Sequence, residues 1–578
     1  MAVEPPRRMR FAADDRPPGA VSAVIGVQTA ILVTVPVVVV TTIVTRIADQ
    51  SDAYLSWAIF ASMVIGGLLT ILQAKRLVGI GGGTLTVMGA SGAAIGVGVL
   101  ALVAGGPALL GMLVLASGLC QLALAARLAL LRRVITPVVS GTLTALVAAT
   151  VIPMAFAMLA RVPASAPPAA APTVAAVTML CVVGIMLRGK RWVRAWNPVI
   201  GMGAGCATAA LFGILDFGRV AAAPWIGIPT PPVSGLDLSL DASFWLLLPG
   251  FLFVSFVITV RQVGENVRMQ RLSGPEPRAI DFRRVQGSVA ACGGGTLLSG
   301  FAGVLPPWPY LAGVGLASGA GIAARRIGAY IGVSFIALAF VPKITALVLS
   351  IPAPVLGAYM TVLFGIVFAQ GMRTLFQEGI DQQYALVAGL AFWIGAGIQF
   401  QAIFPAYVAT PTGRVLANGL TVGGLTILLL HLLLDVTGPR RHRVEVALRA
   451  ESLSELDRFL RDFAARYRWS RKATDRLRAA AEETLLSLLR QEEEGLAPAP
   501  GERRLRVVAR NARSGARMEF TAATHEGNLE NQMVLLGDQP DPASQRDLSL
   551  ALLRHHAASV RHHQYHNVDI VTVRVNRT

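Results

Sequence analysis

The chain has 578 residues, 54% of them hydrophobic, and a mean hydropathy of +0.59, which excludes an ordinary soluble globular protein. Its formal net charge of +18 would indicate a nucleic-acid partner in a soluble protein. Positively charged loops on one side of a membrane, together with a basic tail, account for the charge here, so no nucleic-acid partner is expected.

Most of the chain consists of apolar stretches long enough to cross a bilayer. Residues 1–20 are polar and proline-rich and predict a disordered cytosolic tail without a cleavable signal peptide. Residues 21–436 predict a polytopic α-helical membrane protein with about 14 transmembrane segments in two halves. The first half is expected to span at 21–45, 54–73, 84–104, 107–130, 134–160, 173–187 and 196–214. The second half is expected to span at 243–263, 286–303, 309–324, 327–349, 353–373, 383–399 and 416–435.

Lysine and arginine residues concentrate in every second loop between these spans. This asymmetry predicts that both termini are cytoplasmic and that the protein lies in the inner (plasma) membrane. The loops on the other side hold only Arg46, Arg161, Arg219, Lys343 and Arg414.

The third and tenth spans are interrupted at corresponding places. They read GIGGGTLTVMGASGAAIG (79–96) and PPWPYLAGVGLASGAG (306–321), each a poorly helical entry followed by small residues. Within lipid, non-helical backbone persists only where protein surrounds it or where it lines a cavity. Paired interruptions therefore indicate inverted repeats with a substrate site between them. The alternative, that the small residues only let helices pack closely, stays open.

Residues 437–578 are charged and predict a cytosolic α+β domain. Strands are expected at 443–450, 505–512 and 568–575, and amphipathic helices at 452–466 and 470–490.

The membrane part resembles the nucleobase–ascorbate transporter family, also called nucleobase:cation symporter-2 or xanthine/uracil permeases. VLFGIVFAQGMRTLFQEGID (362–381) is similar to the family's twelfth-span pattern, LANGLTVGGLTILLLHLLLD (416–435) to the last-span pattern, and GASGAA (89–94) to the third-span pattern. The tenth-span pattern is matched by Pro306, Tyr310, Gly315, Gly321, Arg325 and Arg326.

This resemblance implies a seven-plus-seven inverted repeat in which a core domain moves against a gate domain. It implies uptake of a nucleobase or a related small planar polar molecule, coupled to H+ or Na+, by alternating access. It also implies a homodimer formed through the gate. Neither a cofactor nor an enzymatic reaction is expected, because no nucleophile–base pair or metal-ligand set is visible.

The chain departs from the family pattern at its binding positions. The acidic-or-amide residue and the Asn that follow the tenth-span Tyr fall on Ala312 and Gly313. The eighth-span pattern E-x-x-G-[DH] falls on residues 261–265, so Arg261 replaces the carboxylate that grips the base and Glu265 ends the pattern. A guanidinium group suits a carboxylate or another planar anion.

Arg261 and Glu265 are four residues apart and share one helix face. One hypothesis makes Arg261 an anion-recognition group and Glu265 the proton-coupling residue. The alternatives are an internal ion pair between them, or Arg261 lying at the cytoplasmic interface with Arg268 and Arg271.

The remaining candidate substrate-binding residues offer backbone N–H groups, amides or an aromatic ring. Gln28 is expected to be the clearest buried amide and Gln370 a weaker candidate, with a packing hydrogen bond as the alternative. Tyr310 is expected either to stack on a planar ligand or to anchor at the interface. The candidates at the half-helix starts are Ala90, Ser91 and Gly92, and Ala312, Gly313 and Gly315.

Residues 454–489 resemble the first helices of anti-sigma-factor kinases of the histidine-kinase-like ATPase fold. Glu483 fits the first magnesium-site position, but Ser487 stands where that family has Asn, and GDQPDP (537–542) lacks the glycines of the nucleotide loop. Residues 549–563 resemble a later helix of that fold. A degenerate module that regulates or binds a cytosolic protein partner is therefore expected. Its histidines are expected on a solvated helical face, namely His555, His556, His562, His563 and His566.

The sequence predicts one of two functions for the whole chain. The first is a secondary active permease. The alternative is a transporter-derived sensor that reports ligand occupancy to the cytosolic domain.

Overall fold

The structure is a computed structural model that divides the chain into two compact units. The first unit comprises residues 1–273 and 284–433, and the second comprises 274–283 and 434–578. The residues that it describes are 10–131, 134–190, 193–194, 196–216, 218–230, 240–273, 280–376, 382–408, 413, 418–437, 441–493, 504–512, 515–522, 545–565 and 569–577.

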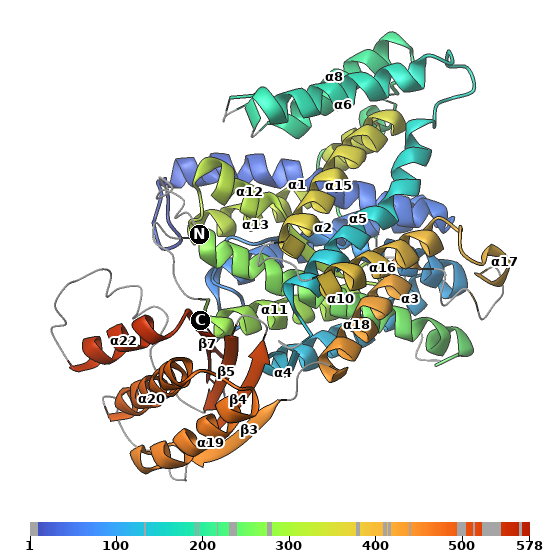
Figure 1. The fold of residues 1–578 in the computed structure, drawn as a ribbon. Helices are drawn as coiled ribbons and strands as arrows, with labels where there is room; N and C mark the ends of the chain where they lie inside the picture. Colours follow the sequence, from blue (N-terminus) through green and yellow to red (C-terminus); the bar gives the residue numbers. More distant parts are fainter. Residues whose placement is uncertain are drawn as a thin grey trace. The chain divides into compact units, whose positions relative to one another are not determined.

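The first half of the membrane unit is a series of long helices with one short strand (Figure 1). Helix α3 turns at Gly105 and Gly106, where Gly106 has a φ of +65° and is followed by Pro107. The predicted third and fourth spans are therefore the two arms of one broken helix. The elements are α1 (Gly19–Ile47), α2 (Asp52–Lys75), β1 (Val87–Ala90), η1 (Gly92–Ala94), α3 (Ile95–Ala126), α4 (Leu128–Leu131), α5 (Pro137–Leu159), α6 (Ala170–Arg188), α8 (Asn197–Leu211) and α9 (Gly218–Ala222).

The second half begins with the same order of two helices, one short strand and a short helical turn. Its interrupted segment includes a π-helical stretch, η2, that ends at Gly321 with a φ of +69°. The elements are α10 (Ala242–Leu272), α11 (Phe282–Phe301), β2 (Pro307–Tyr310), α12 (Ala312–Gly315), η2 (Leu316–Ala320), α13 (Arg325–Ala339), α14 (Pro342–Leu349), α15 (Ala353–Phe376), α16 (Gln382–Gln399), α17 (Pro405–Val408) and α18 (Gly419–Thr437).

The prediction of a polytopic helical membrane protein is confirmed. Among the described residues, eight helices are long and apolar enough to cross a membrane, or up to nine if α13 and α14, bent by 84°, form one span. The other predicted crossings coincide with shorter or more polar helices such as α8, and with the interrupted segment 307–320.

Within the membrane unit the helices pack in two sets. One set consists of α5, α6, α8, α15 and α16, which contact one another. The second set consists of α1, α2 and α13. Helices α3 and α10 pack together as a pair, and contacts between α1 and α3 join this pair to the second set. Glycines permit the closest approaches: a Cβ on Gly141 of α5 would lie 2.7 Å from the Gly371 carbonyl oxygen of α15. Small residues such as these glycines thus allow the helices to pack closely, as the alternative interpretation expects.

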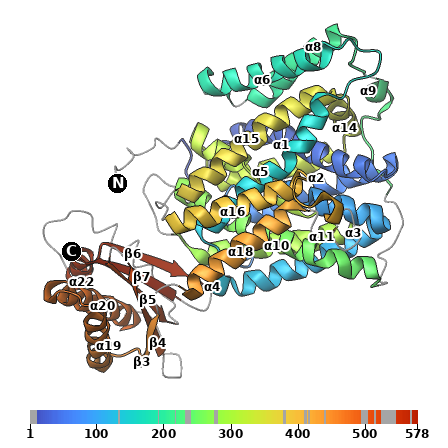
Figure 2. The same ribbon diagram turned by 45° about the vertical axis from the view of Figure 1, so that its right-hand side comes forward.

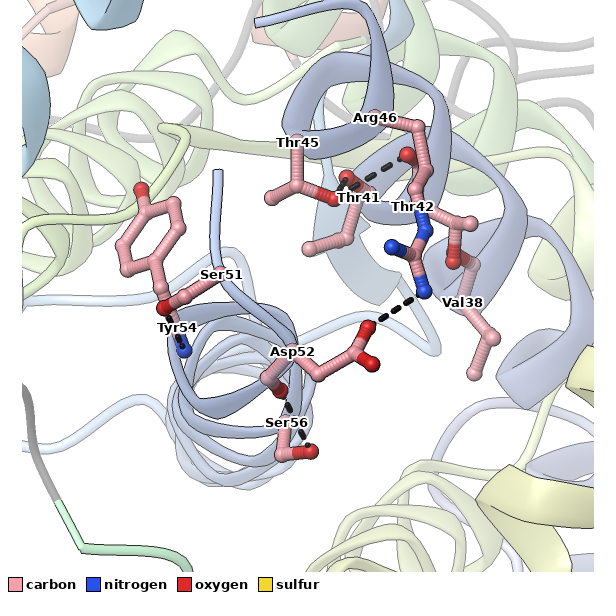
Figure 3. Close-up of polar contacts among 9 residues, drawn as sticks. All are labelled: Val38, Thr41, Thr42, Thr45, Arg46, Ser51, Asp52, Tyr54 and Ser56. Atoms are coloured by element: carbon pink, nitrogen blue, oxygen red, sulfur yellow. Dashed lines mark hydrogen bonds and ion pairs between the residues drawn. The ribbon is translucent and has the colours of Figure 1, made fainter. Parts of the chain in front are cut away.

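The turn between α1 and α2 is held by side-chain contacts (Figure 3). Ser51 caps α2 by accepting a hydrogen bond from the backbone N–H of Tyr54 at 3.2 Å, and Arg46 pairs with Asp52. Thr45 returns a hydrogen bond to the Thr41 carbonyl oxygen at 2.9 Å, as hydroxyls in membrane helices commonly do.

Part of the N-terminal tail predicted to be disordered, from residue 10 onward, lies within the described residues. Residues 10–13 pair with backbone next to the interrupted segment: Phe11 N–H donates to the Gly321 carbonyl at 3.1 Å, and Ala323 N–H donates to the Phe11 carbonyl at 2.9 Å. Asp14 pairs with Arg325. Backbone groups that follow the break in the tenth predicted span thus find hydrogen-bond partners in residues 10–13.

The C-terminal unit is a five-stranded antiparallel sheet of order β3-β4-β5-β7-β6. Figure 2 shows its helices on one side of the sheet, where Leu477, Leu485 and Leu553 join the core formed with Phe520 and Val573. Its elements are β3 (His442–Ala447), η4 (Ala450–Ser452), α19 (Leu453–Arg466), α20 (Arg471–Glu493), β4 (Arg504–Ala512), β5 (Gly515–Ala522), α22 (Gln545–His556), β6 (Ser559–Gln564) and β7 (Asp569–Asn576).

Three expectations for this unit need correction. Its boundary lies at residue 434 rather than 437, and it also contains residues 274–283 between α10 and α11. The helix expected at 549–563 ends at His556, and β6 follows, so His562 and His563 lie on a strand. His562 is fully buried, which contradicts a solvated helical face. His566 and the segment 537–542 lie outside the described residues.

Candidate functional site

The two interrupted segments meet inside the membrane unit. Strands β1 and β2 pair antiparallel with Gly89 opposite Trp308 and Ala90 opposite Pro307. The Ser91 N–H donates to the Pro306 carbonyl oxygen at 2.9 Å, and the Tyr310 hydroxyl donates to the Ala90 carbonyl oxygen at 2.8 Å. The pairing satisfies backbone groups that a membrane helix would otherwise satisfy internally.

Local sequence dictates this extended form. Pro306, Pro307 and Pro309 lack N–H donors and hold their neighbours in extended backbone, so a helix cannot form here. Two side chains of α2 hold the approach to β2. The Tyr54 hydroxyl donates to the Gly303 carbonyl oxygen at 2.8 Å, and the Trp57 indole N–H donates to that of Ala302 at 2.9 Å.

Glycine is required where these segments touch. A Cβ on Gly89 would lie 2.2 Å from the Tyr310 ring, and a Cβ on Gly313 would lie 2.2 Å from the Leu85 carbonyl oxygen. The Asn that the family pattern places at position 313 therefore does not fit this backbone. Gly315 lies on the open side of α12, where a Cβ would have no neighbour within 4 Å.

Arg261 of α10 lies against this crossing. The centre of its guanidinium group is 4.6 Å from the Trp308 ring centroid, within the range of a cation–π interaction, and its Nε lies 3.5 Å from the Pro309 carbonyl oxygen. Across the described residues no ion pair of 4.0 Å or less joins Arg261 to Glu265. The arginine is thus stacked at the crossing and forms no direct ion pair with Glu265 in the part of the chain that is described.

Several buried polar atoms around this crossing have no hydrogen-bond partner among the described residues. Among them are the Ser91 hydroxyl, the Trp308 indole nitrogen and Oε1 of Glu265, on residues that are 0%, 4% and 3% exposed. Glu265 lies one turn beyond Arg261 on α10. Buried polar groups are normally paired, so these atoms make the crossing the candidate site for a polar ligand.

A buried amide and hydroxyl network supports α10 from behind. Gln262 donates to Ser288 of α11 at 2.6 Å, and Ser288 donates to Gln73 of α2 at 2.9 Å. Asn266 donates to Thr84, on the approach to β1, at 3.1 Å. These side chains fix the position of the helix that carries Arg261 and Glu265.

Sequence reasoning misses this network and selects a different amide. Gln28, expected as the clearest buried amide, is only half-buried on α1, whereas Gln73 and Gln262 are fully buried. Gln73 could have been found as the one amide in the apolar run of α2. Gln370 of α15 instead accepts a hydrogen bond from Arg268 of α10 at 3.2 Å.

The other predicted site residues fall into place around the same crossing. Ala90 ends β1, Ser91 precedes η1, and Gly92 begins η1, where a Cβ on Gly92 would lie 3.2 Å from the Trp308 ring. Ala312 begins α12, which a single residue separates from β2. The Tyr310 hydroxyl ties β2 to β1, and stacking of its ring on a planar ligand stays a prediction. In the part of the chain that is described, no group of three or more His, Cys, Asp or Glu side chains could hold a metal ion.

Comparison with known proteins identifies the family of the chain. A family model described as "Permease family" (Xan_ur_permease) matches residues 21–404. The putative purine permease CPE0397 of Clostridium perfringens (strain 13 / Type A) is 27% identical, covering 70% of this chain and 87% of its own. The xanthine permease XanP of Escherichia coli (strain K12) is 26% identical, covering 67% and 85%, and the uric acid permease PucJ of Bacillus subtilis (strain 168) is 26% identical, covering 68% and 88%.

Among solved structures, the transmembrane domain of the cyanobacterium bicarbonate transporter BicA has a TM-score of 0.45 at 16% identity, covering 73% of this chain and 100% of that one. SLC26A9 has a TM-score of 0.48 at 13% identity, covering 74% and 67%. The family model covers most of the chain and includes both interrupted segments and α10. The chain therefore belongs to the xanthine/uracil permease family and is a membrane transporter rather than an enzyme.

Proposed function

We propose that this permease moves a nucleobase or a related small planar molecule across the inner membrane by secondary active transport, with both termini in the cytoplasm. The observation that carries the proposal is the crossing of β1 and β2, where Arg261 stacks on Trp308 beside buried polar atoms without partners among the described residues. Relatives named as purine, xanthine and uric acid permeases support a planar heterocyclic substrate.

The substrate is an anion. Arg261 stands where the family pattern has a carboxylate, and it offers donors in a planar fork instead of acceptors. Stacking on Trp308 leaves the edge of the guanidinium group for a ligand. The Ser91 hydroxyl and the Trp308 indole N–H supply further donors. A purine or pyrimidine that carries a negative charge at neutral pH, such as urate, fits this set better than neutral uracil.

Glu265 carries the coupling proton in this proposal. It is buried one turn from Arg261, and one of its oxygens has no partner within the described residues. A carboxylate at membrane depth is costly to keep without a function. Coupling to H+ needs only this one group, whereas Na+ would need several oxygen ligands.

Alternating access would move the two helix sets against each other. The set of α5, α6, α8, α15 and α16 serves as the gate, and the set with α1, α2, α3, α10 and α13 serves as the core. Arg268 of α10 bonds to Gln370 and Thr374 of α15, so this link between the sets must break in each cycle. The matching order of elements in the two halves supports an inverted repeat, and we place a homodimer contact on the gate.

A sensor remains the second candidate, because Ala312 and Gly313 remove two family binding side chains. In that case the cytosolic domain, a degenerate ATPase-like module with Ser487 in place of the magnesium-binding Asn, would report occupancy to a cytosolic protein.

Uptake into proteoliposomes decides between the two. Labelled urate and xanthine are offered under an inward proton gradient, with or without a protonophore. A permease accumulates a probe above its equilibrium level and loses this accumulation with the protonophore. A protein that binds a probe without moving it would support the sensor. Accumulation that follows a sodium gradient instead would assign Na+ as the coupling ion.

A further inference from the structure

The C-terminal unit includes a piece of the membrane chain. Residues 274–283 lead from α10 into the first turn of α11, yet they belong to the same compact unit as residues 434–578. Of this piece, residues 280–283 are described, and Ile280 is 8% exposed. Asp281 caps α11 by accepting a hydrogen bond from the Arg283 N–H at 2.9 Å.

Aromatic contacts bind this connection to the edge of the cytosolic sheet. The Phe282 ring centroid lies 4.6 Å from that of His563 on β6 and 5.1 Å from that of Tyr565, which follows β6. Tyr565 is 2% exposed, so its ring is part of the packed interior of the unit. Aromatic pairs at these separations stabilise a contact beyond the area that they bury.

A hydrogen bond and an ion pair of Arg283 connect the start of α11 to the same edge of the sheet. Arg283 Nε donates to the Tyr565 carbonyl oxygen at 3.2 Å, and the Arg283 guanidinium group lies 3.9 Å from the Asp569 carboxylate at the start of β7. Asp569 is 1% exposed. A cation close to a buried carboxylate is favourable, so this contact helps to hold Arg283 against the unit.

The two helices joined by this connection both reach the candidate substrate site. Helix α10 carries Arg261, which stacks on Trp308. Helix α11 carries Cys292, whose thiol lies 3.6 Å from the Pro307 carbonyl oxygen, and Ser288, which bonds to Gln262 of α10. A change in how α10 and α11 lie at the crossing therefore acts on the connection, and a fixed connection opposes that change.

We propose that the C-terminal domain regulates transport by clamping the α10–α11 connection through Phe282 and Arg283. The domain thus acts on its own chain, and a cytosolic protein or a change at β6 that released the clamp would alter the rate of the cycle. This inference rests on the proposed transport function, since a cycle must exist to be regulated. A domain tied to the membrane part only through α18 would need no contacts with Phe282 and Arg283.

The test needs a readout that does not depend on transport. Cys292 is 1% exposed beside β2, so its rate of reaction with a small maleimide reports opening at the crossing. The other cysteines are removed in the full-length chain by Cys120→Ala, Cys181→Ala and Cys206→Ala. In this background the labelling rate is compared among Phe282→Ala, Arg283→Gln, Arg283→Lys and the unchanged chain.

The matched control is Arg506→Gln, which breaks an arginine–carboxylate pair with Glu445 elsewhere in the same sheet. We expect Phe282→Ala and Arg283→Gln to change the Cys292 labelling rate by about fivefold or more, the usual size of coupling between sites. Arg283→Lys keeps a cation beside Asp569 and is expected to stay near the unchanged rate, as is the control. Size-exclusion chromatography and limited proteolysis confirm that each variant is folded.

If Phe282→Ala and Arg283→Gln label like Arg506→Gln, the clamp does not control the crossing and the inference is overturned. Uptake of urate and xanthine by the unchanged protein is measured in parallel. Failure of uptake together with altered labelling would overturn the proposed function and leave the coupling supported. Unaltered labelling together with normal uptake would overturn the coupling and leave the proposed function supported.

Discussion

The guanidinium group of Arg261 stacks on the Trp308 ring at 4.6 Å, which joins the eighth predicted span to the interrupted tenth. Arg261 places a positive charge where the family pattern has a negative one, and Trp308 lies on the strand that pairs with β1. This contact therefore connects the chain's departure from its family with the place in the membrane unit where the two non-helical segments meet.

Replacing Trp308 with Leu should weaken ligand binding through the loss of this stacking. Cation–π contacts contribute about 0.5–2 kcal/mol, so urate affinity should fall by about 2- to 30-fold. Trp308→Phe keeps a ring under the guanidinium group and should lose less. Isothermal titration of both variants makes the comparison, and equal losses would show that the indole N–H, rather than the stacking, matters.

Glu265→Gln should uncouple transport from the proton gradient. The variant keeps the shape of the side chain but cannot release a proton, so gradient-driven accumulation should fall by about tenfold or more, the equivalent of about 1.4 kcal/mol. Exchange of labelled for unlabelled substrate should persist, because it needs no net proton movement. Glu445→Gln, at an exposed ion pair of the cytosolic sheet, is the control. Normal accumulation by Glu265→Gln would exclude Glu265 as the coupling residue.

Two neighbouring glycines of α12 should respond oppositely to the same substitution. Gly313→Ala places a Cβ 2.2 Å from the Leu85 carbonyl oxygen, and overpacking of this kind costs about 1–3 kcal/mol. Gly315→Ala meets no atom within 4 Å and should leave the melting temperature unchanged or slightly higher. Thermal unfolding in detergent measures both, and equal effects would show that the two segments are not in close contact.

Tyr310→Phe should destabilise the crossing without removing the ring. The substitution leaves the Ala90 carbonyl oxygen without its 2.8 Å partner, and an orphaned buried acceptor costs about 1–3 kcal/mol. The melting temperature should fall, and hydrogen exchange at residues 87–94 should rise. Tyr330→Phe, on α13, serves as a control for loss of a hydroxyl. No difference between the two variants would contradict the role given to Tyr310.

The stability of the C-terminal domain should decrease in mild acid because of His562. Burial, followed by the nearby His563 and Arg283, lowers the pKa of His562 to about 3. The unfolded chain takes up this proton near pH 6.5 and the folded domain does not, so the free energy of unfolding falls as pH drops from about 6.5 toward 3. Between about pH 6.5 and about pH 5 the loss should be about 2 kcal/mol.

Pulse proteolysis in urea at several pH values, with detection of the C-terminal fragment, measures this slope. His562→Gln should flatten it, whereas His555→Gln, at an exposed position, should not. A slope that His562→Gln leaves unchanged would assign the acid sensitivity to other groups, such as His556, whose pKa is also lowered by desolvation.

The sequence predicts the membrane fold well because its signals are local. Apolar length marks the helices, and the glycines of 79–96 and the prolines of 306–309 mark the breaks. The pairing of β1 with β2 could not be predicted, because both strands are four residues long and almost wholly buried, which leaves no alternation to read. Sequence alone favours Gln28 over Gln73 because local apolarity does not reveal which helix face is buried.

The contact between Arg283 and Tyr565 is equally hidden, since 282 residues separate the two along the chain. The sequence SVRHHQ of β6 also lacks the apolar alternation that identifies a strand, so its histidines are wrongly predicted to lie on a helix. Such features depend on tertiary neighbours rather than on the segment itself.

The central claim is that Arg261 makes this site selective for planar anions. Thermal shifts of the full-length protein and of Arg261→Glu are measured with uracil and with uracil-6-carboxylate, which share a ring and differ in charge. Ligands that bind the folded state raise its stability by mass action. The account predicts that only the carboxylate raises the melting temperature of the unchanged protein and that Arg261→Glu abolishes this response. Stabilisation by uracil that equals that of the carboxylate, or a carboxylate response that survives Arg261→Glu, would contradict it.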